Sequence, residues 1–436
     1  MKSVVLLSLL EPTLAALSGT LNIIAFNVAG LPEIINGNDV PGDKATNTEI
    51  IGERLSQYDY DIIHVQEDFN YHAYLYSTNT HPYRTATSGG VPFGSGLNTL
   101  SNYPWIDFHR VKWDSCSNES GADCLTPKGF TVMRVRVDEG VYVDCYNLHA
   151  DAGSGDEDRA TRSANLQQVA DHISTFSIGN AVMVFGDTNA RYTTLSENIR
   201  IFGSQEDMVD PWVELILDGQ EPTIGTDAIT CSNPTTTMEC ETVDKIFYRG
   251  SRALTIQATE WAYEDSKFLN NGDILSDHNP VAANFSWSRS DDFRLSDLYG
   301  GPHGTWFNTL PFLPTSISGI KATKMSLAGG NRLDSITLTL SDGTSTTHGG
   351  TGGTASELSL SDGEYWTSTR VCQGKYNDRT RIFYLQATTN LGNSVATGVE
   401  TEECVEWTAD EGFGVVGLMG RSGEEVDMVG VVYGRY

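Results

Sequence analysis

The residues best suited to chemistry are acids, amides and imidazoles that stand where apolar runs end. Five such places follow one another in the stretches "LNIIAFN", "IIHVQED", "CYNLHAD", "VMVFGDTN" and "SDHNP". Their polar members are Asn27, Glu67, His149, Asp187, Asn189, Asp277 and His278. Taken alone, each stretch also fits a turn, a solvated acid or a buried histidine. Their joint presence favours one composite site, because independent coincidences would have to multiply.

These residue types suit the hydrolysis of a phosphoester. Carboxylate and amide oxygens bind hard divalent cations such as Mg²⁺, which keep positions open for water and substrate phosphate. The polar residues at these strand ends include no cysteine, which argues against a closed zinc site. Two imidazoles can then divide the work, since one can activate a water while the other stabilises charge or protonates the leaving oxygen.

An arrangement of sheets and helices has to bring these distant residues together. Between about Thr20 and Trp287, apolar runs typical of strands alternate with helical patterns. The pattern predicts helices over 46–58 and 162–176, and in the second the apolar residues recur at helical spacing. This alternation predicts an α/β sandwich with sheets inside and helices outside. Strand ends share an edge in such a fold, so their polar residues can converge.

A second domain is expected beyond a polar stretch. Helical periodicity disappears after "SRSDDFRLSD", and "DSITLTLSDGTSTTHGGTGGT" alternates apolar and polar residues with glycine turns. We therefore expect a catalytic domain over 19–289, a linker over 290–297 and an all-β domain over 298–436.

The charge balance weighs against tight binding to nucleic acid. The 436 residues include 28 lysines and arginines against 57 aspartates and glutamates, a formal net charge of −29. A duplex-binding protein needs a basic face to displace counterions. Bound divalent cations can bridge two acidic partners, so a nuclease stays open as an alternative.

The cysteines and the first residues indicate secretion. By proximity the seven cysteines pair as Cys116–Cys124, Cys231–Cys240 and Cys372–Cys404, which leaves Cys145 in a predicted buried strand. Short disulfides in polar loops suit an oxidising compartment. Residues 1–18 combine a lysine, a short apolar run and small residues, which predicts a signal peptide. The alternative is a disordered start to a cytosolic protein.

The ordered blocks resemble a known superfamily. Asn27 is followed by "QED" at 66–68, "NLH" at 147–149, "GDTN" at 186–189 and "SDH" at 276–278. Residues 20–287 thereby resemble the endonuclease/exonuclease/phosphatase superfamily, which includes deoxyribonuclease-I-like nucleases, neutral sphingomyelinases and inositol polyphosphate phosphatases. The resemblance implies a four-layer α/β/β/α sandwich and Mg²⁺-dependent phosphodiesterase or phosphatase activity.

The resemblance also implies roles for individual residues. Asn27 and Glu67, joined by Asp277, would hold the Mg²⁺. His278 would be the general base, and the neighbouring Asp277 is our first choice for the carboxylate that orients it, ahead of Asp244. Asp187 and Asn189 would position water and phosphate, and His149 would stabilise the transition state or assist the leaving group. Lys128 and Asp151 are candidate substrate contacts.

The superfamily leaves the substrate open. The stretch "TVDKIFYRG" at 242–250 is most similar to the sphingomyelinase group. The Pro-Ala-Trp-Cys-Asp-Arg block of the inositol phosphatases is missing. We rank release of a phospholipid head group, as from sphingomyelin, first and a secreted nuclease second. A catalytically silent glycan-binding protein is the remaining alternative.

The all-β region resembles the jacalin-related lectins, which are β-prisms. Glycine clusters at 299–308 and 347–354 carry the resemblance, together with a Gly-x-x-x-Asp loop at 423–427. In such lectins the aspartate accepts hydrogen bonds from sugar hydroxyls, while loop amides and an N-terminal glycine approach the ring. The resemblance assigns sugar binding to Gly301, Gly304, Gly423, Glu425, Val426 and Asp427. Glu424 and Glu425 add negative charge that departs from the family pattern.

Overall fold

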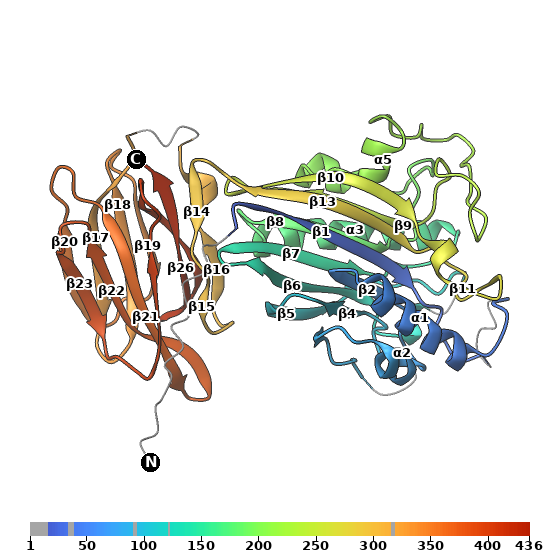
Figure 1. Ribbon diagram of the computed structural model, residues 1–436, viewed down its shortest axis with the longest axis horizontal. Helices are drawn as coiled ribbons and strands as arrows, with labels where there is room; N and C mark the ends of the chain where they lie inside the picture. The colour runs from blue at the N-terminus through green and yellow to red at the C-terminus, as the bar shows by residue number, and fades with distance from the viewer. Residues whose placement is uncertain (1–15, 34–38, 90–93, 121–122, 315–318) are drawn as a thin grey trace, which may run out of the picture.

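The computed structural model describes residues 16–33, 39–89, 94–120, 123–314 and 319–436. An α/β body and an all-β body lie side by side along the long axis of the molecule (Figure 1). Residues 1–15 of the predicted signal peptide lie outside the described ranges, and Ser18 begins the first strand. Within those ranges we find no helix that is both long enough and apolar enough to cross a membrane.

Two sheets form the centre of the α/β body. The first has the strand order β10-β13-β1-β2-β4-β3, with bounds Leu254–Tyr263, Val281–Arg289, Ser18–Asn27, Ile62–Gln66, Asn98–Ser101 and Tyr83–Arg84. The second has the order β5-β6-β7-β8-β9, with bounds Trp105–Lys112, Gly129–Asp138, Val141–Leu148, Ala181–Asp187 and Asp244–Arg249. The pairs β1–β2 and β7–β8 are parallel, and the other neighbours are antiparallel. A short hairpin of β11 (Leu269–Asn270) and β12 (Asp273–Ile274) precedes β13.

Helices cover the outer face of the first sheet. The residues of β1 alternate, so that Ile24 packs in one core with Ile51 of α1 and Leu75 of α2, while Ile23 belongs to the core shared with the second sheet. The bounds are Lys44–Tyr58 for α1 and His72–Thr78 for α2. This alternation follows from the two-residue period of a strand that is buried on both faces.

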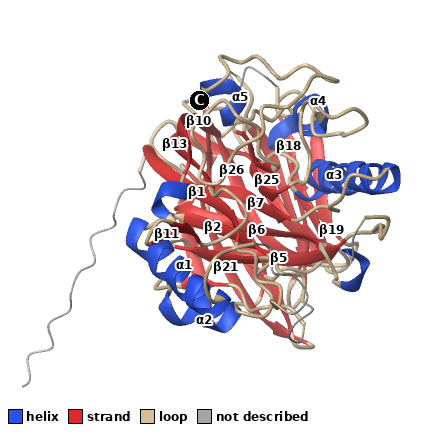
Figure 2. Cartoon of the chain, turned by 90° about the vertical axis from the view of Figure 1, so that its right-hand side faces the viewer, coloured by secondary structure: helices blue, strands red, loops and turns tan. Residues whose placement is uncertain are grey.

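The second sheet has its own helical layer. Leu166 and Ile173 of α3 share a core with Val184 of β8. The bounds are Asp156–Phe176 for α3, Ile201–Glu206 for α4 and Pro211–Leu215 for α5. Helices therefore lie on both sides of the paired sheets (Figure 2), and the predicted α/β/β/α sandwich is confirmed.

The all-β body consists of three sheets around one apolar core. Their orders are β14-β26-β25-β16 with β15 on β26, then β19-β18-β17-β20, then β23-β22-β21-β24. The strands are Phe293–Leu295, Tyr299–Gly300, Thr305–Asn308, Ala322–Gly329, Leu333–Leu340, Ser345–Gly349, Thr354–Ser359, Trp366–Tyr376, Arg379–Thr389, Ser394–Gly398, Glu403–Thr408, Phe413–Ser422 and Val426–Arg435, numbered β14 to β26. Leu327, Val371 and Val431 bring one residue from each sheet into the core. The predicted β-prism is confirmed.

The two bodies are joined by more than a linker. Residues 293–295 of the predicted linker form β14, which pairs with β26 of the β-prism. Asp297 accepts hydrogen bonds from Arg136 at 2.8 and 2.9 Å and from the hydroxyl of Tyr142 at 3.0 Å. The expected linker is therefore structured. The Asp297 carboxylate accepts hydrogen bonds that Arg136 and Tyr142 of the α/β body would otherwise make to water.

A buried ion network continues this interface. The Asp107 carboxylate of β5 accepts from Arg134 of β6 at 3.2 Å and from Arg421 of β25 at 2.8 Å. The Arg134 guanidinium also lies 3.6 Å from the centre of the Trp306 ring. Buried charges have to be paired, and these contacts pair them across the interface between the β-prism and the α/β body.

All three predicted disulfides form, and Cys145 is free and buried as expected. Cys372 and Cys404 face each other in register between β21 and β24. The other two pairs close loops of the α/β body.

Candidate functional site

Strand direction brings the predicted catalytic residues to one edge of the sandwich. Asn27 ends β1, Glu67 follows β2, and Asp187 ends β8. The antiparallel strands β9 and β13 begin at this same edge. Asp244, the first residue of β9, is therefore in register with Asp187, and His278 lies just before β13.

The buried amide of Asn27 lies at the centre of the cluster. Its Nδ2 atom is 3.3 Å from Glu67 Oε1, 3.1 Å from Asp187 Oδ2 and 3.4 Å from His278 Nε2. Its Oδ1 atom accepts a hydrogen bond from the backbone N–H of Ala29 at 3.1 Å. Asn27 would therefore act as a metal ligand only with its amide turned over, so that the oxygen points inward.

Glu67 has the properties of a cation ligand. It adopts a left-handed backbone conformation with φ of 53°, which turns the chain directly after β2. Gly30 passes so close that a Cβ atom there would lie 2.3 Å from the Glu67 carbonyl oxygen. The Oε2 atom is buried and has no hydrogen-bond partner among the described residues. Burial raises the pKa of Glu67, and the positive charge of Lys128 opposes this rise.

This corner of the site fits a hard divalent cation. An unpaired buried carboxylate oxygen is costly to keep, and a cation would satisfy it with the oxygen ligand that Mg²⁺ prefers. Asp187, Asp244 and His278 form a second candidate group, since each offers a ligand atom within 4.8 Å of the others. The hydrogen bond between Asp244 and His278 already uses two of these three groups, which favours the Glu67 corner.

His278 is oriented by Asp244 and not by its neighbour Asp277. The His278 Nδ1 atom lies 2.8 Å from Asp244 Oδ2, while its Nε2 atom faces Asp187 Oδ2 at 3.9 Å. Asp277 is exposed and has no hydrogen-bond partner among the described residues. Our expectation that Asp277 steers the imidazole is therefore wrong, because the antiparallel pairing of β8 and β9 brings a closer carboxylate to the ring.

Carboxylates on both sides of His278 favour its protonated form. Burial opposes the charged ring, but the negative charges of Asp244 and Asp187 outweigh it and raise the pKa of His278 well above its ordinary value. A cation placed among these carboxylates would offset their effect and lower this pKa. The charge of the site and the unpaired oxygen of Glu67 thus both fit a divalent cation.

His149 is a buried, neutral imidazole beside the same carboxylate. Its Nε2 atom lies 3.1 Å from Lys128 Nζ and 3.4 Å from Asp187 Oδ2. These two contacts require opposite tautomers, so only one of them can be a hydrogen bond at a time. Burial, followed by the charge of Lys128, lowers the pKa of His149 to about 3.

Asp187 lies near both histidines, His149 and His278, and Asn189 follows it just after the end of β8. The Asp187 Oδ1 atom accepts from the backbone N–H of Asn189 at 2.9 Å. The Asn189 amide donates to the Ala150 carbonyl at 3.1 Å, and its backbone is left-handed with φ of 50°. The five predicted residues Asn27, Glu67, His149, Asp187 and His278 therefore belong to one connected cluster.

The candidate substrate contacts lie next to this cluster. Lys128 forms an ion pair with Asp123 as well as its contact with His149. Asp151 accepts from the Ser117 backbone N–H at 2.8 Å, and burial raises its pKa to about 6. Both are close to the catalytic groups, but nothing in the geometry assigns them a substrate.

Other motif residues have structural roles. Gln66 Nε2 donates to Asn147 Oδ1 at 2.8 Å, and Asn147 donates in turn to the Val65 carbonyl at 3.1 Å. The "QED" and "NLH" blocks therefore tie the two sheets together beside the site. Asp68 accepts from Asn98 at 2.7 Å and lies 2.6 Å from His72 Nδ1, away from the catalytic groups.

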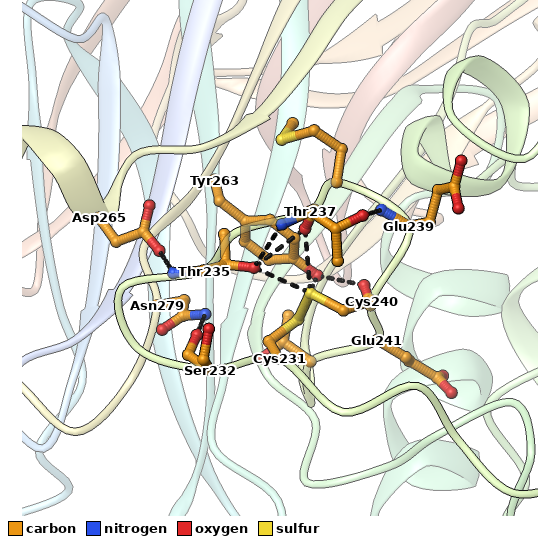
Figure 3. Close-up of a disulfide and its surroundings, with 12 residues drawn as sticks. Cys231, Ser232, Thr235, Thr237, Glu239, Cys240, Glu241, Tyr263, Asp265 and Asn279 are labelled. Carbon is orange, nitrogen blue, oxygen red and sulfur yellow. Dashed lines mark hydrogen bonds between the residues drawn. A yellow bond between two sulfur atoms is a disulfide. The ribbon is translucent and has the colours of Figure 1, made fainter.

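The loop closed by Cys231–Cys240 supports the segment that contains His278 (Figure 3). Asn279 Nδ2 donates to the Ser232 carbonyl at 2.9 Å, and Asn233 Nδ2 donates to the Ser276 carbonyl at 2.9 Å. Asn233, Asp277 and His278 line an open cleft of about 390 Å³. Sequence reasoning missed this support, and the only signal for it was the polar loop that the cysteine pair encloses.

The predicted sugar-binding residues meet at one end of the β-prism. The Gly301 backbone N–H donates to the Asp427 carbonyl at 2.8 Å, and a Cβ atom at Gly304 would lie 2.6 Å from Asp427 Oδ2. The N–H of Gly423 donates to the carbonyl of Glu425 at 2.9 Å. Residues from the two ends of the domain thus form one loop cluster.

Three side chains of this loop cluster are already engaged. Both carboxylate oxygens of Glu425 accept from Arg332, at 2.7 and 2.5 Å. Val426 is fully buried in the core. Asp427 forms an ion pair with Arg381. The sugar-binding roles of these residues remain predictions.

Two family models match the chain. Residues 23–223 match "Endonuclease/Exonuclease/phosphatase family 2", and residues 296–432 match "Jacalin-like lectin domain". The sphingomyelinases of Mycobacterium tuberculosis and Mycobacterium bovis are each 38% identical over 279 residues, which cover 62% of this chain and 54% of theirs. The chain thus spans about half the length of these curated relatives.

Solved structures resemble each half separately. A beta toxin mutant from Staphylococcus aureus with bound magnesium ions matches 61% of this chain and 99% of its own, at 16% identity and a TM-score of 0.43. The wild-type Malaysian banana lectin matches 33% of this chain and 98% of its own, at 25% identity and a TM-score of 0.29.

Proposed function

We propose that this chain, in which an endonuclease/exonuclease/phosphatase domain precedes a jacalin-like lectin domain, is a secreted, metal-dependent phosphodiesterase that releases the head group of a phospholipid such as sphingomyelin. The observation that carries the proposal is His278, held by Asp244 at 2.8 Å and facing Asp187 within a cluster that includes the unpaired carboxylate oxygen of Glu67. The sphingomyelinases that share 38% identity support this choice of substrate.

His278 is suited to act as the general base. With its Nδ1–H donated to Asp244, the ring directs Nε2 toward Asp187 and Asn27. When it is neutral, Nε2 can take a proton from a water that attacks the phosphorus. Asp244 then stabilises the imidazolium that forms, as an orienting carboxylate does in catalytic triads.

Positive and polar groups on the other side suit the leaving oxygen. Lys128 and His149 lie together beside Asp187. Lys128 can stabilise negative charge that develops on the phosphoryl group or leaving oxygen, and His149 can donate a hydrogen bond there. A divalent cation held by Glu67, with Asn27 turned to offer its oxygen, would neutralise charge on the phosphoester.

The lectin domain would dock the enzyme on glycans. The meeting of Gly301, Gly304 and the 423–427 loop supports this part of the proposal. The three disulfides support secretion, since such bonds persist in oxidising compartments. The net charge of −29 makes nucleic acid a disfavoured substrate.

The proposal is tested with one preparation of the full chain on three substrates. Sphingomyelin, phosphatidylinositol and DNA are incubated with Mg²⁺ or with a chelator, and product release is measured. We expect cleavage of sphingomyelin that requires the cation and falls about 10²- to 10⁴-fold in the variant His278→Ala. Cleavage of DNA alone would favour a nuclease. Inactivity on all three substrates beside clear glycan binding would favour a silent binding protein.

A further inference from the structure

The carboxylate that the lectin loop would offer to a sugar, that of Asp427, is sealed: it is buried and paired with a cation. The side chain of Asp427 is only 1% exposed, and Arg381 of β22 forms an ion pair with it. Gly304 lies against its second oxygen. A neutral sugar hydroxyl could reach this carboxylate only by displacing the guanidinium, and breaking a buried ion pair is costly.

The β21–β22 hairpin that contributes Arg381 to this ion pair carries three cations, with Arg379 and Arg381 on one face and Lys375 on the other. Lys375, Arg379 and Arg381 fall within the stretch "KYNDRTR" at 375–381, where Asp378 is the one acid, in a chain whose net charge is −29. Lys375 donates to the hydroxyl of Thr380 at 2.8 Å. Arg379 is exposed, and its side chain has neither a hydrogen bond nor an ion pair within the described part of the chain. The Arg381 Nε atom also has no hydrogen-bond partner there.

The loop from Tyr299 to Gly304 covers one side of this cluster. Gly301 lies so close to the β21–β22 hairpin that a Cβ atom would be 2.5 Å from the Thr380 carbonyl oxygen. Burial, followed by the charges of Arg381 and Arg379, lowers the pKa of His303 in the same loop. The nearby acid Glu425 is neutralised by Arg332. Among the described residues, Lys375 and Arg379 are therefore cations without an ion pair beside this carboxylate, where Asp378 and Glu424 are the exposed acids.

We propose that this surface binds glycans through an acidic group, a carboxylate or a sulfate, which is held by Arg379 and Arg381, with Lys375 adding positive charge from the other face of the hairpin. Guanidinium groups match such anions with paired, charge-assisted hydrogen bonds. The anion would add to the Arg381–Asp427 pair, whereas a neutral sugar would have to break it. This inference rests on the glycan binding proposed above and specifies its ligand class.

The test measures binding of free sugars to the full chain by titration calorimetry. The probes are sialyllactose, a sulfated disaccharide and methyl α-mannoside, so that a carboxylate, a sulfate and a neutral sugar are compared. We expect at least one acidic sugar to bind and the mannoside to bind roughly tenfold or more weakly. The exposed variant Arg379→Glu should weaken acidic binding about 10- to 100-fold, as expected when a charge-assisted hydrogen bond is lost. Lys375→Glu, on the other face of the hairpin, should weaken it by a smaller factor.

Two further variants sharpen the result. Arg370→Glu is the matched control, because Arg370 stands on the same strand β21 but is paired with Glu400 and should leave binding unchanged. Arg381→Ala removes the cation that seals Asp427, so we expect acidic binding to fall and mannoside binding to rise. If this variant does not fold, the two exposed variants still decide the question.

Several outcomes would overturn the proposal. Mannoside binding as tight as that of both acidic sugars would refute the acidic preference and leave glycan binding intact. The absence of any sugar binding would refute both, while phosphodiesterase activity of the same preparation is judged separately. Binding to vesicles that contain phosphatidylserine, without binding to acidic sugars, would also refute it, because the anion would then belong to a lipid.

Discussion

Replacing Asp244 by asparagine should slow catalysis far more than it disturbs the fold. The substitution keeps the size of the side chain but removes the charge that Nδ1 of His278 meets at 2.8 Å. An asparagine amide can also turn its nitrogen toward the ring, which would favour the tautomer with the proton on Nε2, where the base has to accept one. A wrong tautomer costs about 10⁴-fold in a serine protease triad, and loss of general-base catalysis costs about 10²- to 10⁴-fold. We therefore expect kcat to fall by about 10²- to 10⁴-fold while KM changes little.

The assay is steady-state release of phosphocholine from sphingomyelin by the full chain, with unfolding temperatures measured alongside. Asp277→Asn is the informative comparison, because Asp277 is next to His278 in sequence but forms neither a hydrogen bond nor an ion pair with the ring, and the loss of activity in this variant should be clearly smaller. Asp273→Asn, at an exposed position of β12, controls for the change in charge and should keep full activity. Activity of Asp244→Asn within about threefold of wild type, beside a hundredfold loss for Asp277→Asn, would refute our assignment.

Three further predictions follow from other parts of the structure. In Glu67→Gln, the rise in unfolding temperature that Mg²⁺ or Mn²⁺ gives the wild type should disappear, and a retained rise would place the cation elsewhere. Burial lowers the pKa of His64 to about 3, so the imidazole stays neutral in the folded state, whereas in the unfolded chain it is protonated below about pH 6.5. The free energy of unfolding should therefore fall by about 1.4 kcal/mol per pH unit as the pH drops from 6.5 toward 3. His64→Phe should flatten this decline in denaturant titrations, and an unchanged slope would contradict it. Asn233→Ala removes the hydrogen bond to the Ser276 carbonyl, and should lower kcat several-fold with little change in KM or unfolding temperature; Asn233→Gln should restore part of the rate if position is what matters.

Local patterns in the sequence determined the architecture. The apolar spacing of 162–176 predicted α3, and the two-residue alternation of the strands after 320 predicted the all-β body. The ordered motif blocks identified the α/β domain, and the glycine clusters with the Gly-x-x-x-Asp loop identified the β-prism. Proximity was enough to pair the cysteines, because short loops bring their ends together at little cost.

The site itself was only partly predictable. Glu67, His149, Asp187 and His278 were found because each follows or precedes an apolar run, a signal that lies within a few residues. The partner of His278 was misjudged, since Asp277 is adjacent in sequence but Asp244 is adjacent in space. The support that Asn233 gives from the disulfide loop carried no sequence signal of its own.

Only the tertiary structure decided which segments far apart in the chain come into contact. The register of β8 against β9 sets Asp244 opposite Asp187, and the approach of the two bodies buries Asp107 between Arg134 and Arg421. Likewise, the Gly-x-x-x-Asp loop could be recognised in the sequence, but the ion pair between Arg381 and Asp427 of this loop could not. Periodicity and spacing report which face of an element is buried, whereas the pairing of individual charges depends on how strands align and how domains dock, which no local window of sequence contains.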